Sequence, residues 1–144
     1  MRKIYLASPF FTEKELIVYK EVISLLRKLK DVDVFVPMEH EIKNGFDMEN
    51  NVWANKVFNT DKKALYESDY VFVLNFGMYS DSGTAWEAGY AFAMGKKVYQ
   101  VCCGENCDYS LMMMNGCTHV ITLEDLRKGI LPNKEERLSN IIQK

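Results

Sequence analysis

The stretch YVFVLNFGMYSDSGTAWEAGYAFAMGKKVYQVC, residues 70–102, decides the fold class of this 144-residue chain. Residues 70–75 are almost wholly apolar, as expected of a strand that is buried on both faces of a sheet. A helix is predicted over residues 83–94, stopped by Gly95, and a further strand over residues 97–102. A strand, a helix and a strand in this order predict a parallel unit whose central strand is residues 70–75.

The same alternation continues on both sides of this unit. Further strands are predicted at residues 4–7, 32–36 and 119–121, and further helices at residues 12–30, 52–67, 110–114 and from residue 122 onward, with a break near residue 132. Thr12 with Glu15, and Thr122 with Asp125, have the spacing of helix-capping pairs. The polar residues 38–51 predict a long loop. We therefore predict one α/β domain over residues 1–144, with a doubly wound, flavodoxin-like or Rossmann-like sheet of five parallel strands.

Charge and hydropathy restrict the partners. The net charge of −2 gives no electrostatic basis for binding nucleic acid or an anionic membrane, although it does not exclude a nucleoside, which carries no phosphate. The apolar run at residues 4–11 is too short for a signal peptide, and no run approaches membrane-spanning length. We expect a cytoplasmic protein. The spacing of Cys103 and Cys107 fits no common zinc motif, so we expect reduced thiols, no metal and no cofactor.

Glu87 is the candidate for chemistry in the helix after the central strand. It is the one charged residue among residues 84–93, in a helix that we expect to be buried on most sides. A carboxylate there is costly unless it is partnered or used. Gly83 permits a close approach, and the helix N-terminus favours an ionised carboxylate. Spacing by itself also fits a structural interpretation, in which Asp81 or Ser82 is only an N-cap and Glu87 is an exposed helix residue.

Two other residues fit either interpretation. Tyr5 lies on the first predicted strand, next to the central strand, where its phenol can hold a carboxylate or belong to the core. Asp61 lies in the predicted helix 52–67, whose inner face we expect to include Trp53. It is either a solvated carboxylate or a group that the helix carries into a pocket with Trp53.

Together these segments resemble the nucleoside 2-deoxyribosyltransferase family. The resemblance covers KIYLASPFF (3–11), VWANKVFNTD (52–61), SDYVFVLN (68–75) and DSGTAWEAGYAFAMGKKV (81–98). It implies an enzyme of nucleoside salvage that moves 2-deoxyribose between bases, with a deoxynucleoside and a free nucleobase as its partners. It also implies a homo-oligomer whose active sites are completed by a neighbouring subunit.

The resemblance implies a role for each candidate site residue. Glu87 is the nucleophile that attacks the anomeric carbon, Tyr5 orients it, and Asp61 manages the proton on the departing base. Asp81 binds sugar hydroxyls, beside Gly83. The other implied substrate contacts are Trp53 and Phe11, which are apolar, Glu41, which meets the base, and Ser110 and Met112, which border a neighbour's site.

Hydrolysis is the alternative reaction. Asp81 favours free nucleosides, because a carboxylate would repel a substrate phosphate. Ser110, however, suits N-glycoside hydrolases of deoxynucleosides or their 5′-monophosphates, since transferases often have asparagine there. The chain also ends in residues 141–144, IIQK, without the aromatic residue that closes a neighbour's site in some family members. A third alternative is a flavodoxin-like sensor without chemistry, although residues 7–11 form neither an acidic cluster nor a phosphate loop.

Overall fold

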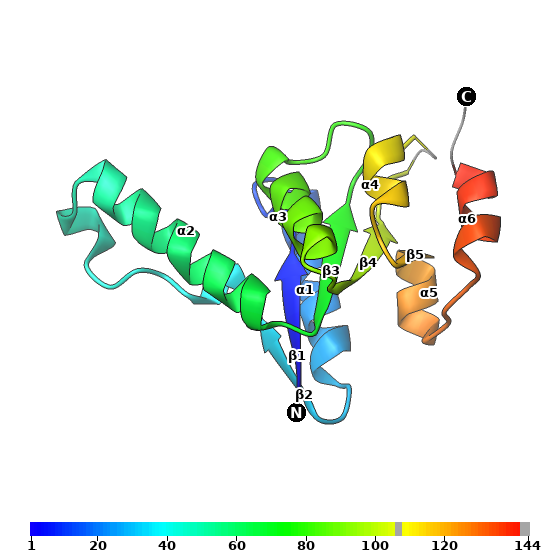
Figure 1. Ribbon diagram of the computed structural model, residues 1–144, viewed down its shortest axis with the longest axis horizontal. Helices are drawn as coiled ribbons and strands as arrows, with labels where there is room; N and C mark the ends of the chain where they lie inside the picture. The colour runs from blue at the N-terminus through cyan, green and yellow to red at the C-terminus, as the bar shows by residue number, and fades with distance from the viewer. Residues whose placement is uncertain (106–107, 142–144) are drawn as a thin grey trace.

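Five parallel strands form one sheet in the order β2-β1-β3-β4-β5 (Figure 1). The computed structural model describes residues 1–105 and 108–141. The strands are β1 (Arg2–Ala7), β2 (Val32–Phe35), β3 (Tyr70–Asn75), β4 (Lys97–Cys102) and β5 (His119–Thr122). The predictions of a central strand at 70–75 and of a doubly wound sheet of five parallel strands are confirmed, and the observed order is the flavodoxin-like one of the two types expected. The order reverses between β1 and β3, and ligands of such folds bind beyond the strand ends at this point.

Within the described residues, six helices connect and flank the strands. They are α1 (Glu13–Arg27), α2 (Asn50–Glu67), α3 (Ser82–Ala93), α4 (Leu111–Asn115), α5 (Leu123–Lys128) and α6 (Lys134–Ile141). The predicted capping boxes of Thr12 with Glu15 and of Thr122 with Asp125 are both present. Two short 3₁₀ turns, η1 (Pro37–Glu39) and η2 (Gly45–Asp47), lie within the predicted long loop. None of the described helices is long and apolar enough to cross a membrane.

The apolar side chains of the sheet alternate between two cores. On β1, Ile4 and Leu6 belong to the core under α1 and α5, whereas Tyr5 and Ala7 belong to the core under α2, α3, α4 and α6. Since successive residues of a strand face opposite sides of the sheet, this alternation sends Tyr5 toward α3. The layers are therefore helix, sheet and helix.

Helices α2 and α3 are less covered than the sequence predicts. The N-terminal half of α2 projects beyond the sheet (Figure 1), and Trp53 is 46% exposed, so its expected place on an inner face is wrong. Burial of α3 on most sides is also wrong for the chain by itself, because Trp86 is 48% and Phe92 is 50% exposed. Periodicity shows that a helix face is apolar but not whether this chain or another copy covers it.

Candidate active site

Tyr5 and Glu87 meet where the strand order reverses. The Tyr5 hydroxyl donates a hydrogen bond to Oε2 of Glu87, joining β1 to α3. Tyr5 is fully buried, and its ring stacks on Phe35 of β2 with 5.5 Å between the ring centroids. Because the sheet and the stack fix the phenol, it can hold the carboxylate in one position. The structure thus brings together the two residues that the sequence left open.

The surroundings of Glu87 hold its carboxyl near the balance between its two protonation states. Burial raises the pKa of Glu87 to about 7, the Tyr5 hydrogen bond opposes the rise, and the negative charges of Asp61 and Asp81 add to it. Burial and the Glu87 charge also raise the pKa of Tyr5, which keeps its phenol protonated as a donor. A nucleophilic carboxylate is therefore available at neutral pH and above.

Asp81 caps α3. Its Oδ2 accepts hydrogen bonds from the Thr84 backbone N–H at 2.9 Å and from the Thr84 hydroxyl at 3.0 Å. A Cβ at Gly83 would lie 3.2 Å from the same oxygen, so glycine allows the carboxylate to fold back over the first turn. The expected N-cap is present, and both of its bonds use one of the two carboxylate oxygens.

Asp61 lies half-buried on α2, within electrostatic reach of the central pair. Burial raises the pKa of Asp61, and the nearby His40 opposes the rise. The negative charge of Asp61 in turn raises the pKa values of Tyr5 and Glu87. Sequence reasoning predicted a long loop over residues 38–51 but did not identify His40 within it. The signal it could have used is a titratable ring in that loop.

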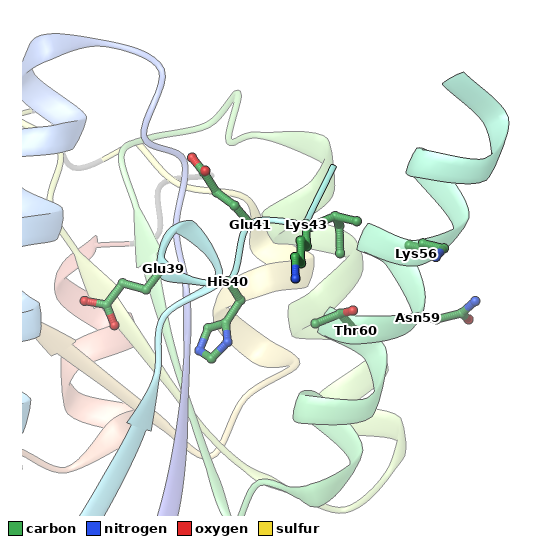
Figure 2. Close-up of a pocket in the computed structure, with 8 residues that line it drawn as sticks. Glu39, His40, Glu41, Lys43, Lys56, Asn59 and Thr60 are labelled. Carbon is green, nitrogen blue, oxygen red and sulfur yellow. The ribbon is translucent and has the colours of Figure 1, made fainter. Parts of the chain in front are cut away.

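A pocket of about 640 Å³ opens between the loop after β2 and α2 (Figure 2). Glu41 lines it, together with His40, Thr60 and neighbouring residues of the loop and helix, whereas Glu87 does not. Trp53 packs against this loop, since a Cβ at Gly45 would lie 2.8 Å from its ring. Asp61 does not line the pocket either, although Thr60, the residue before it on α2, does.

The other expected contacts lie on the surface of this chain. Phe11 is 75% and Met112 is 77% exposed. The Ser110 hydroxyl caps α4 and accepts from the Met113 backbone N–H at 3.5 Å. Two features of the sequence, Cys107 and the terminal residues 142–144, lie outside the described residues. Within the described part of the chain no three potential metal ligands cluster, and burial raises the pKa of Cys103 to about 12, which keeps that thiol protonated.

Comparison with known proteins points to one family. The model of the nucleoside 2-deoxyribosyltransferase family matches residues 4–124. A nucleoside deoxyribosyltransferase from Lactobacillus leichmannii is 26% identical over 139 residues, 88% of this chain and 87% of that protein. The solved structure of a 2-deoxyribosyltransferase from Bacillus psychrosaccharolyticus is 31% identical, covers 88% of this chain and 89% of that one, and has a TM-score of 0.77. A CMP N-glycosidase from Clostridium botulinum, 20% identical over 96% of this chain and 97% of that one, shares the fold with a TM-score of 0.59.

Proposed function

The chain belongs to the nucleoside 2-deoxyribosyltransferase family, and we propose that it moves 2-deoxyribose between nucleobases by a retaining double displacement at Glu87. The observation that carries the proposal is the contact between the buried Tyr5 hydroxyl and the Glu87 carboxyl. Burial raises the pKa of this carboxyl to about 7, and the fixed phenol holds it in place. Glu87 is therefore a nucleophile that is both positioned and able to ionise.

The first half-reaction breaks the N-glycosidic bond. A carboxylate oxygen of Glu87 bonds to the anomeric carbon as the bond to the base breaks, and the bonding electron pair leaves with the base. A base is a poor leaving group as an anion, so Asp61 in its protonated form gives it a proton. The raised pKa of Asp61 supports this role, because a carboxyl with an ordinary pKa would hold no proton near neutrality.

The second half-reaction reverses these steps with another base. A ring nitrogen of the incoming base attacks the anomeric carbon, the Glu87 ester bond breaks, and the Asp61 carboxylate takes up the proton that the incoming nitrogen loses. Two inversions retain the configuration. Asp81 binds a sugar hydroxyl with the carboxylate oxygen that does not cap α3, and its charge favours substrates without a 5′-phosphate. Glu41, Trp53 and Phe11 surround the base.

Hydrolysis of the same glycosyl intermediate is the second candidate. Ser110 favours hydrolysis, because its short hydroxyl already caps α4 and can make fewer hydrogen bonds to a substrate than a longer amide side chain could. Hydrolysis needs only that water reach the ester before a base does.

Base exchange separates the two reactions. The protein is incubated with a deoxynucleoside and a different free base, and the products are resolved by chromatography. A new nucleoside supports transfer, whereas deoxyribose without any new nucleoside contradicts it. A slowly reacting 2-fluoroarabinosyl nucleoside should then leave an adduct on the peptide that carries Glu87. The exposed Glu135 on α6 supplies the matched control: Glu135→Gln should still form the adduct, and Glu87→Gln should not.

We also propose that a second copy of the chain covers α2 and α3 and completes the site. The support is an exposed aromatic cluster in which Trp86 contacts Phe58 and Tyr90, with ring centroids 5.4 and 5.3 Å apart. Soluble monomers rarely expose such a contiguous apolar surface. Sedimentation should find an oligomer, and Trp86→Glu should dissociate it and reduce base exchange. A monomeric wild type that is fully active would contradict this proposal.

A further inference from the structure

His40 occupies a defined place beside the site. Its ring stacks on Phe35 with 4.0 Å between the centroids and 12° between the planes, and Phe35 stacks in turn on Tyr5. Figure 2 shows His40 on the loop side of the pocket and Thr60, the residue before Asp61, on the α2 side. The three stacked rings thus lead from the Glu87 partner to the pocket wall opposite Thr60, the residue that precedes Asp61. A ring held in this way cannot move freely along the surface.

The charge of His40 acts on two carboxyl groups, those of Glu39 and Asp61. Glu39 is engaged mainly by Arg27, whose guanidinium donates to its Oε2 at 2.8 Å and lowers the pKa of Glu39, and the charge of His40 makes a smaller contribution in the same direction. His40 is the group whose charge opposes the effect of burial on Asp61. The other titratable groups that face the pair or line the pocket are Tyr5 on β1, Tyr19 on α1, Glu87 on α3, Lys56 on α2, and Glu41 and Lys43 on the loop.

We propose that His40 is a positioning residue for the leaving base, whose positive charge stabilises the Asp61 carboxylate that remains after the proton has passed to the base. The inference rests on the proposed function, since it assigns the environment of the same proton donor. No proton leaves His40 in this step. The glycosidic electron pair goes to the base, the proton goes from Asp61 to a base nitrogen, and the imidazolium offsets the new negative charge.

Two substitutions separate charge from stacking. His40→Phe keeps an aromatic ring on Phe35 and removes the charge, whereas His40→Asn removes both. Both variants should lower kcat for base exchange on the order of tenfold, less than the 10²- to 10⁴-fold that loss of a general acid costs. Both should also move the alkaline limb of the kcat profile to higher pH, because Asp61 then keeps its proton longer. Lys63→Gln, which removes an exposed cation paired with Glu67 on the same helix, should leave kcat and the profile unchanged.

Carbon NMR can monitor the titration of the Asp61 carboxyl directly, and it tests the effect of the His40 charge on Asp61 without turnover. The midpoint should rise in His40→Phe and His40→Asn and stay at the wild-type value in Lys63→Gln. An unchanged midpoint in both His40 variants overturns the inference, and so does a His40→Phe enzyme with the wild-type kcat profile, which would leave only a stacking role. If the wild type exchanges no bases, the proposed function fails, and the NMR midpoint still decides whether His40 acts on Asp61.

Discussion

Replacing Glu87 with glutamine should stabilise the protein at neutral and alkaline pH while it abolishes transfer. The carboxyl has an ordinary value of 4.5 in the unfolded chain, and burial raises its pKa to about 7 in the fold. Between these two values the unfolded chain releases a proton that the folded chain retains. The free energy of unfolding therefore falls as the pH rises through this window, because ionising Glu87 in place costs more than ionising it in water.

The size of the effect follows from the same two values. Each unit of pKa difference corresponds to about 1.4 kcal/mol, so the folded wild type loses about 3 kcal/mol between pH 4.5 and pH 7. Glutamine has no such titration, and its side-chain oxygen can still accept the Tyr5 hydrogen bond. The two proteins should therefore be about equally stable below pH 4.5, and the variant should be more stable by about 3 kcal/mol above pH 7.

Urea unfolding at a series of pH values from 4 to 8.5 measures this difference. Both proteins should have the same m-value, so the difference in the midpoint concentration reports stability. Glu135→Gln is the control, because this exposed carboxylate should give a difference that hardly depends on pH. A Glu87→Gln difference that is constant with pH, or a variant that becomes less stable as the pH rises, would refute the assignment of a buried, destabilised carboxyl.

Substitutions at three further residues test other parts of the site. Tyr5→Phe removes the hydrogen bond that opposes the rise in the Glu87 pKa, so the acid limb of kcat should move to higher pH and kcat should fall; an unmoved limb would contradict the role of the phenol. Asp81→Asn should keep the N-cap, whereas Asp81→Ala should lose about 1 kcal/mol of stability in thermal unfolding. Both variants should raise the KM for the deoxynucleoside, and an unchanged KM would mean that Asp81 is only a helix cap. Gly45→Ala would place a Cβ 2.8 Å from the Trp53 ring, so it should raise the KM for the free base with little change in kcat, and an unaltered KM would remove Trp53 from the base site.

The strands were predictable because their apolar character can be read directly from the sequence. The limits of β3 match the apolar run at 70–75, since a strand covered on both faces has apolar side chains on both faces, and the limits of β4 match the strand predicted at 97–102. The capping boxes of α1 and α5 were predictable for a similar reason, because each depends on two side chains three residues apart.

The site was less predictable because its contacts join distant segments. Tyr5 and Glu87 are 82 positions apart, and their hydrogen bond exists only because β1 pairs with β3 and α3 follows β3. Spacing therefore left Glu87 open between a catalytic and a structural role, and the family resemblance carried the prediction. His40 was missed because its significance depends on its stack with Phe35 and on the pocket that it lines together with residues of α2, which no local pattern encodes.

The two carboxyl groups of the proposed mechanism have opposite requirements. Glu87 must be ionised to attack, whereas Asp61 must be protonated to release the base. Both have raised pKa values, and a negative charge on Asp61 raises that of Glu87 further, so the two groups compete for protons in one site. A proton on Asp61 therefore favours ionised Glu87, and this combination is the productive one. Tyr5 favours it by donating to Glu87, and the same site is reset when the incoming base returns a proton to Asp61. The configuration is retained because the Glu87 ester is formed and broken with inversion each time. Transfer is reversible because the proton that leaves Asp61 with one base returns to it from the next.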